Sequence, residues 1–479
     1  MNAPLTTISL AECDARQASR GTTSGPQSVY GGPLSRHVAA GDSRLLHVRF
    51  DGSTAALRLW NFLLTEEQRL RAARARGMKI VGVMKDLGTV PVMAYALPNM
   101  LAFYPDGAWW IPCIMERHQS CIATADALGI DESFCPVRAM LGAFVSGAHF
   151  PRPDVLTCSV GATCDDFSAI AQRLEGLGIP ITWWEMPYHR LPEQGEAALP
   201  LPGGGCAPRA LVDFVAAELE RVKLCLEEVA GAALDEAALS AGIRRANAVR
   251  RVLAHLRRQI FSAHLNPLPA LELLIAEMLA IHFCSDIEES RAVLEDLLRE
   301  VEQRVQAGDG YGSADAVRVF WVNPVADLRA MSLLEDAGAR VCGTDNMFLH
   351  ALDEIAEDLP PMQALACAAL ADPMTGPAAR RGARICRDSR AAFADAVIIA
   401  RIPGASHCAT EGTEIAGMVR AELGIPVTEI EVPSVCDADL PALRTRVEAT
   451  IEAAREHRRQ RECGVRNAER GVGQAASLS

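Results

Sequence analysis

Short apolar runs alternate with stretches of helical periodicity over most of the chain, and this alternation limits the fold more than any other feature. The run 79–84 is largely apolar and predicts a buried strand, and the stretch 91–100 predicts a helix with proline in its first turn. The runs 154–160 and 179–185 predict two further strands, separated by a helical stretch over 165–177. Such alternation is typical of a parallel sheet with helices packed on its faces.

The same alternation returns in the C-terminal third of the chain. Its predicted strands are 317–322, 339–343, 396–400 and 426–432, and its predicted helices include 327–337, 411–423 and 440–456. A Pro/Gly cluster at 199–206 marks a boundary before this unit, and helical periodicity follows it to about residue 306. The sequence therefore predicts an α/β protein with two flavodoxin/Rossmann-like parallel-sheet domains joined by a helical segment.

We expect the chain to divide into five regions. The Ser/Thr/Gly-rich residues 1–45 are predicted to form a disordered tail, and the polar residues 458–479 a second tail. Between them we expect an α/β domain over 46–207, a helical segment over 208–310 and a second α/β domain over 311–457. A chain of 479 residues exceeds the usual size of one domain, which agrees with this division.

The composition argues against several classes of function. The net charge of -13 disfavours nucleic-acid binding, which needs clustered positive charge. Lys79, Lys85 and Lys223 are the only lysines among 47 basic residues, and none lies in a GxxxxGK[ST] loop, so ATP hydrolysis through such a loop is not expected. Neither a membrane span nor a secretory signal is evident, so we expect a cytoplasmic protein with reduced thiols.

Three of the 15 cysteines are predicted to lie where a loop enters a helix. Cys164 follows one predicted strand and directly precedes a helix, and Cys408 follows another strand in the second unit. Cys135 precedes Pro136, a residue that suits the first turn of a helix. In open parallel sheets ligands bind outside the carboxyl ends of the strands, and a helix N-terminus favours thiolate over thiol. This placement makes the three cysteines candidate ligands of an iron–sulfur cluster.

Spacing alone leaves open the alternative that these cysteines only pack in the core. The chain has no CxxC motif, so it carries no local zinc or iron–sulfur signature, and any site must be assembled from distant segments. Four other cysteines lie in apolar patterns and are expected to be core residues: Cys158, Cys225, Cys284 and Cys342. Cys113 and Cys121 precede Cys135, and Cys121 is a rival for the role of first ligand.

Several motifs follow one another in an order that carries a resemblance. The segments concerned are 134–142 (FCPVRAMLG), 151–154 (PRPD), 160–165 (VGATCD), 185–188 (EMPY), 302–306 (EQRVQ), 334–339 (LEDAGA), the cysteine at 408, and 445–448 (TRVE). Over about residues 76–456 this order resembles the 2-hydroxyacyl-CoA dehydratase family, which includes subunits of the ATP-dependent benzoyl-CoA reductases.

The resemblance implies a [4Fe–4S] cluster held between two α/β domains by Cys135, Cys164 and Cys408, with its fourth iron open. It also implies an acyl-CoA substrate, a heterodimer with a related paralogous subunit, and a separate ATP-hydrolysing iron–sulfur activator that donates electrons. We therefore expect an oxygen-sensitive, ATP-dependent acyl-CoA reductase of the benzoyl-CoA reductase type, which serves anaerobic aromatic degradation by one-electron reduction of a CoA thioester at low potential. The alternatives are a 2-hydroxyacyl-CoA dehydratase component, which removes water, and a non-catalytic electron-relay subunit.

Other polar residues lie at predicted strand ends and are candidates for the catalytic site. His407 adjoins Cys408, while Tyr188 and His189 follow the strand 179–185 and are candidates to line a substrate pocket. Backbone N–H groups of the loop 85–89 are candidates to face the thioester or the cluster. Arg138 follows Cys135 closely, so it either neutralises cluster charge or faces solvent.

Overall fold

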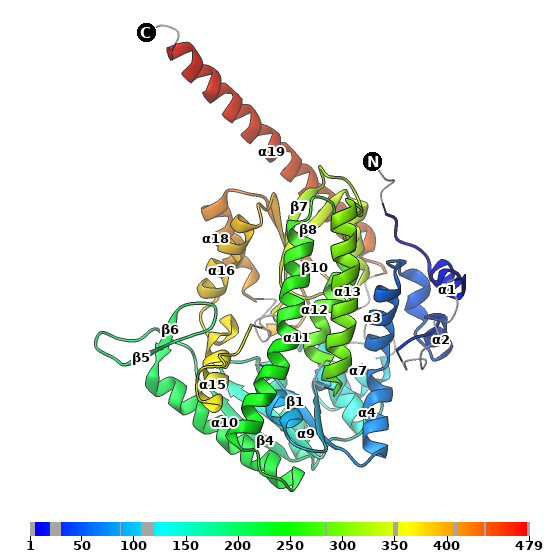
Figure 1. The fold of residues 1–479 in the computed structure, drawn as a ribbon, viewed down its shortest axis with the longest axis vertical. Helices are drawn as coiled ribbons and strands as arrows, with labels where there is room; N and C mark the ends of the chain where they lie inside the picture. The colour runs from blue at the N-terminus through cyan, green and yellow to red at the C-terminus, as the bar shows by residue number, and fades with distance from the viewer. Residues whose placement is uncertain are drawn as a thin grey trace.

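The computed structural model describes residues 5–19, 30–86, 88–106, 119–282, 285–347, 353–406, 410–434 and 437–476. Two four-stranded parallel sheets organise this part of the chain, one in each half (Figure 1). The predicted α/β fold with two parallel-sheet domains is therefore confirmed.

The first sheet contains β1 (Lys79–Met84), β2 (Met100–Phe103), β3 (Val155–Gly161) and β4 (Ile181–Met186). Its strand order is β2-β1-β3-β4, and neighbouring strands are parallel. Three of these strands were predicted. The predicted helix over 91–100 ends early, as α5 (Val90–Ala96), because the chain turns through a left-handed Asn99 and then enters β2.

The second sheet contains β7 (Val317–Val322), β8 (Ala339–Asp345), β9 (Ala396–Arg401) and β10 (Val427–Glu431). Its order is β10-β9-β7-β8, which reads β8-β7-β9-β10 from the other edge. If the strands of each sheet are numbered along the chain, both sheets therefore have the spatial order second, first, third, fourth. In each sheet the strand order therefore reverses between the first and third strands. The loops that leave these two strands flank the crevice where open α/β sheets bind ligands.

Helices cover both sheets, which explains why the strands are buried almost continuously. The helices that pack on the first sheet are α4 (Glu66–Ala75), α5, α9 (Asp165–Gly176) and α10 (Arg209–Ala230). The helices that pack on the second sheet are α14 (Arg329–Asp336), α16 (Ala378–Ala391), α18 (Gly412–Leu423) and α19 (Leu440–Ala476). The remaining short elements in the described ranges are α7 (Gln119–Ala127), η2 (Pro136–Arg138), α8 (Ala139–Ser146), β5 (Ala198–Pro200), β6 (Cys206–Pro208), α15 (Pro361–Ala371) and η5 (Pro373–Thr375).

A helical segment connects the two sheets, as the sequence predicts. It consists of α10, α11 (Glu236–Ser262), α12 (Ala270–His282) and α13 (Ile287–Ala307), and Figure 1 shows α11 and α13 side by side. Asp235 and Asp286 cap α11 and α13 by accepting hydrogen bonds from backbone N–H groups of the first turn. Because α11 contacts both α5 and β8, it fixes one sheet relative to the other.

The N-terminal residues in the described ranges are packed against the body of the protein. They form α1 (Leu10–Ser19), α2 (Ser35–Ala39) and η1 (Ser43–His47), and α3 (Thr54–Leu64) follows. Leu34 and Leu45 are fully buried, and Leu5 donates a backbone hydrogen bond to Gly310. The prediction of a disordered tail over 1–45 is therefore wrong for the described residues, because apolar side chains scattered among polar ones find partners far along the chain.

The C-terminus also differs from the sequence prediction. Residues beyond 458 were expected to form a loose tail, but α19 continues as a helix to Ala476 and projects from the body in Figure 1. Across the described ranges, helices with the length and apolar character to cross a membrane are absent.

Candidate functional site

Cys164 lies at the N-terminus of α9, where the sequence places it. It is the N-cap residue of this helix and follows β3 through a short loop. Gly161 makes this loop possible, because its φ of +99° is left-handed and an added Cβ would clash with the carbonyl of Met186. The Cys164 Sγ lies 3.3 Å from the hydroxyl oxygen of Ser406 and 3.4 Å from a carboxylate oxygen of Asp166.

The loop that follows β9 meets Cys164 from the second sheet. The backbone N–H of Ser406 donates a hydrogen bond of 3.2 Å to the Asp166 carboxylate, so Asp166 joins the start of α9 to this loop. Cys408 and His407 follow Ser406 directly but lie outside the described residues. The described geometry thus brings the segment leading to Cys408 into contact with Cys164, across the boundary between the two sheets.

Cys135 borders the same loop from a third direction. It is the N-cap residue of η2, which leads into α8. Gly404 lies so close to the carbonyl of Phe134 that an added Cβ would clash with it, and Cys135 packs against the hydrophobic cluster of Ala326, Ile402 and Ala405. The loop 402–406 therefore contacts both Cys164 and the segment that carries Cys135.

Burial dominates the electrostatics of Cys164. Burial raises the pKa of its thiol, the Lys85 ammonium group lowers that pKa in part, and the Asp166 carboxylate raises it further. Cys158 and Cys342 are buried within strands, and burial raises the pKa of each thiol to about 12. This is the behaviour of core cysteines, as predicted for these two.

The other cysteines named from the sequence divide between core positions and residues that are not described. Cys121 is buried in α7, where an added Cβ at Gly142 would clash with its backbone, and burial raises the pKa of its thiol. Cys225 is half-buried with its Sγ 3.3 Å from the Thr182 hydroxyl. Cys113 and Cys284 lie outside the described residues. In the described ranges no cluster of three or more His, Cys, Asp or Glu side chains has the geometry of a metal site.

Comparison with known protein families identifies the relationship. The family model for the 2-hydroxyglutaryl-CoA dehydratase D-component matches residues 93–453, which is more than half of the chain. The chain belongs to this family. The match agrees with the resemblance to 2-hydroxyacyl-CoA dehydratases seen in the sequence and shows a dehydratase-type enzyme component. A search of curated proteins finds no match.

In this member of the dehydratase family, Arg138 is a buried residue of the Cys135 segment. Its guanidinium donates hydrogen bonds of 3.2 Å to Asp126 and to the carbonyl of Phe134. The alternative that Arg138 faces solvent is wrong, because only 8% of it is exposed. Arg138 therefore helps to fix the backbone that carries Cys135.

In the loop after β1, backbone N–H groups are hydrogen-bonded to a side chain of the same loop. The Asp86 carboxylate accepts hydrogen bonds from the N–H groups of Thr89 and Val90 and from the hydroxyl of Tyr104. Within the loop 85–89, the Thr89 N–H is therefore engaged by Asp86 and does not face a thioester or a cluster, in contrast to the sequence-based expectation for this group. Leu87 lies outside the described residues.

Tyr188 and His189 follow β4, and the structure separates their environments. His189 is buried: its N–H donates to the carbonyl of Thr375, and its Nε2 lies 3.2 Å from the carbonyl oxygen of Cys206. Burial lowers the pKa of His189, so the imidazole favours its neutral form. Tyr188 is 58% exposed. His189 thus ties the loop after β4 to β6 and η5.

The carboxyl edge of the second sheet contains an ion network that the sequence did not reveal. Arg381 of α16 is fully buried and pairs with Asp345 at 2.7 Å and with Glu411 at 3.0 Å. It also donates to the side-chain oxygen of Asn323 at 2.7 Å. No local pattern distinguishes Arg381 from the other arginines of α16, so only tertiary structure identifies it.

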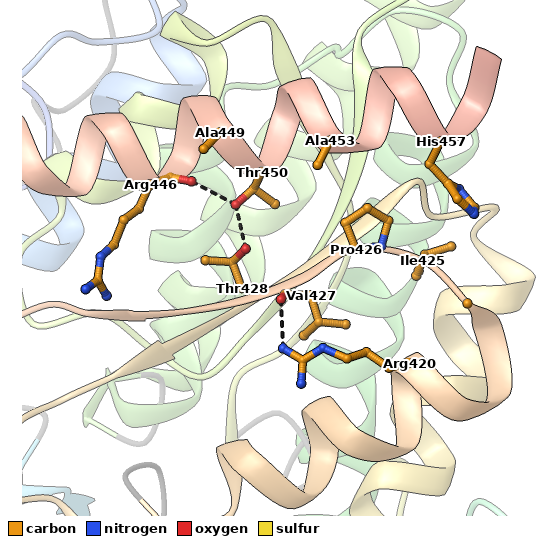
Figure 2. A pocket seen from close by; sticks show the side chains of 11 residues that line it. Arg420, Ile425, Pro426, Val427, Thr428, Arg446, Ala449, Thr450, Ala453 and His457 are labelled. Atoms are coloured by element: carbon orange, nitrogen blue, oxygen red, sulfur yellow. Dashed lines mark hydrogen bonds between the residues drawn. The ribbon is translucent and has the colours of Figure 1, made fainter. Parts of the chain in front are cut away.

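Two cavities lie away from the cysteine loops. One of about 540 Å³ is lined by Arg420 of α18, by 425–428 at the start of β10, and by one face of α19 (Figure 2). Arg420 donates to the carbonyl of Val427, and Thr450 donates to Thr428. The other, of about 500 Å³, runs along α14. The first cavity opens at the amino end of β10, which is the opposite edge of the sheet from Ser406.

Proposed function

We propose that this chain is the cluster-binding subunit of a dehydratase that removes water from a 2-hydroxyacyl-CoA, with Cys135, Cys164 and Cys408 as ligands of one [4Fe–4S] cluster. The observation that carries the proposal is the contact of Cys164 with Ser406, two residues before Cys408. The packing of Cys135 against the cluster of Ala326, Ile402 and Ala405, two of which belong to the same loop, supports it further.

The chemistry of the described donors fits such a cluster. Cys135 and Cys164 both occupy N-cap positions, where helix N–H groups without helical partners and the positive end of the helix dipole favour anionic sulfur. Neither forms a disulfide. The Cys164 thiol donates to Asp166, and ligation would replace this proton. The buried side chain of Arg138 holds the Cys135 segment in place.

A bound cluster would supply a low-potential electron to the CoA thioester. The residues of the chain have the supporting tasks of holding the sulfurs, orienting the two helix N-termini and shielding the site from water. Asp166 links α9 to the loop after β9, so it keeps the cysteine-bearing segments of the two sheets in contact. His407, adjacent to Cys408, is the proposed proton donor near the substrate.

The proposal includes partners. A D-component belongs to an enzyme of several components, so we propose a heterodimer with a related subunit and a cytoplasmic ATP-hydrolysing activator that delivers electrons. The absence of a phosphate-binding lysine loop in this sequence supports a separate activator.

Anaerobic purification followed by iron and sulfide analysis tests the ligand assignment. We expect about four iron atoms per wild-type chain and large losses in Cys135→Ser, Cys164→Ser and Cys408→Ser. Cys158→Ser is the matched control, because Cys158 is buried on β3 only six residues before Cys164. Full iron content in Cys164→Ser, or iron near zero in the wild type, would overturn the assignment.

Activity with the partner and activator distinguishes the reaction. Dehydration of a 2-hydroxyacyl-CoA is the expected result. Reduction of an aromatic acyl-CoA without loss of water would instead favour the benzoyl-CoA reductase branch. Cluster reduction without turnover of either substrate class, in the presence of all components, would identify an electron-relay subunit.

A further inference from the structure

Lys85 has an unusual backbone conformation at the carboxyl end of β1. Its φ is +53°, in the left-handed region that costs a residue with a side chain about 1 kcal/mol or more. The hydroxyl of Ser159 on the neighbouring strand β3 donates a hydrogen bond to the Lys85 carbonyl and holds this conformation. Strained positions of this kind concentrate at functional sites.

The conformation directs the Lys85 side chain toward the start of α9. Its Nζ lies 5.8 Å from the centre of the Phe167 ring, a distance typical of a cation–π contact. Phe167 is the third residue of α9, three positions after the N-cap residue Cys164. The ammonium group is therefore held beside the first turn of α9, on the side of the crevice between β1 and β3.

Among the described residues Lys85 has no carboxylate partner, unlike the other two lysines. Lys79 pairs with Asp154 at 3.5 Å, and Lys223 pairs with Glu220 at 2.7 Å. The Lys85 ammonium group instead lies over the ring of Phe167, in the first turn of the helix that Cys164 caps. A half-buried cation at the start of α9, without a carboxylate partner of its own, is suited to balance anionic sulfur at the N-terminus of that helix.

We infer that Lys85 is a positioning residue whose ammonium group is the counter-charge of the anionic cluster at Cys164 and raises its reduction potential. This inference rests on the proposed function. One-electron reduction adds one negative charge to the cluster, and a nearby fixed positive charge stabilises the reduced form more than the oxidised form. Removal of that charge therefore makes reduction harder.

Electron paramagnetic resonance during an anaerobic redox titration with dithionite measures this effect on the full-length chain. We expect Lys85→Gln to shift the midpoint potential to more negative values. Lys85→Arg keeps the positive charge, so it should leave the potential near the wild-type value. Lys85→Asn is the second neutral variant, because asparagine tolerates a left-handed φ and so separates lost charge from backbone strain. It should shift the potential in the same direction.

Lys79→Gln is the matched control, since it removes the same charge at the opposite end of β1. It should leave the potential unchanged. An unchanged potential in both neutral Lys85 variants, with iron content equal to the wild type, would overturn the inference. Failure of the proposed function is recognised earlier and separately, as a wild-type chain that contains no cluster to titrate.

Discussion

The carboxyl edges of the two sheets share one strand order but are filled differently. At the second edge, Arg381 cross-links the ends of β7 and β8 to α18 through ion pairs and hydrogen bonds of 2.7–3.0 Å. At the first edge, the hydrogen bonds of Cys164 with other described residues are the longer contacts of a thiol, at 3.3–3.4 Å. The carboxyl edge of the second sheet is thus cross-linked by charged groups, whereas Cys164 at the edge of the first sheet is held by weaker contacts.

Equivalent positions of the two sheets show how this difference arises. Lys85 and Asn323 each follow the first strand of their sheet, and both have a left-handed φ, of 53° and 72°. The Asn323 side chain is satisfied within the protein, because it donates to Ala400 and accepts from Arg381. The Lys85 ammonium has no such ion partner among the described residues. The same left-handed backbone feature is therefore fixed by side-chain partners at Asn323 and leaves the charged group of Lys85 without an ion pair among the described residues.

The largest effect is expected at the second edge. Arg381→Met leaves Asp345 buried without its cation, so the free energy of unfolding should fall by about 3–5 kcal/mol. Urea denaturation measures this loss. Arg387→Met, on the exposed face of the same helix, should change it by less than about 0.5 kcal/mol. A loss below about 1 kcal/mol for Arg381→Met would remove the distinction between the two edges.

Substitution of Gly404 tests whether the loop after β9 supports the segment that carries Cys135. Gly404→Ala introduces a Cβ that clashes with the Phe134 carbonyl at a left-handed φ of +77°, and it should destabilise the fold by about 2–4 kcal/mol and reduce cluster content. Gly178→Ala is the control, because Gly178 has a similar φ of +80° but open space around it, and it should cost about 1 kcal/mol with unchanged cluster content. Equal effects of the two substitutions would argue that the loop 402–406 does not support Cys135.

The pH dependence of stability tests whether Glu272, a buried carboxyl group away from the second edge, is protonated in the folded protein. Burial beside Asp51 raises the pKa of Glu272 to about 8, so the folded state holds a proton that the unfolded state has released. Stability contributed by this proton is lost as the pH rises from about 4.5 toward 8. Glu272→Gln keeps the acceptor for Asp51 and Trp60 and abolishes this loss.

The unfolding free energy of Glu272→Gln minus that of the wild type should therefore rise by about 1–2 kcal/mol between pH of about 6 and about 8. Denaturation at the two pH values measures the gain. A wild type and variant with parallel pH profiles would show that Glu272 is ionised in the folded protein.

The smallest effect is expected at the loop after β4. Tyr188→Ala should change the unfolding free energy by less than about 0.5 kcal/mol, because Tyr188 is exposed. His189→Ala should cost about 1–2 kcal/mol, since it leaves the Cys206 carbonyl without its partner. Thermal unfolding compares the two, and the reverse order would show that Tyr188 packs against the protein.

Local sequence patterns were sufficient to predict most strands and the helical segment. The strands β1 and β7 match their predicted ranges, because parallel strands covered on both faces are short apolar runs. β2 was missed because its four residues continue the apolar pattern of α5, and only the short turn 97–99, which ends at the left-handed Asn99, separates them.

The arrangement of the candidate site depended on tertiary structure. The sequence places Cys164 and Cys408 after strands, but the contact between Cys164 and Ser406 requires the helical segment to orient the two sheets. The buried role of Arg381 was equally hidden, since α16 contains several arginines at helical spacing. The packed N-terminal segment was missed because its buried leucines, such as Leu34 and Leu45, lie among polar residues without a sustained helical or strand periodicity.

The central claim is that three cysteines from distant segments hold one cluster between the two sheets. Anomalous diffraction at the iron absorption edge, from crystals grown without oxygen, tests it most directly. We predict a single compact iron peak in contact with the sulfur atoms of Cys135, Cys164 and Cys408. Iron located elsewhere, or these sulfurs free of iron in crystals of an iron-loaded preparation, would contradict the account.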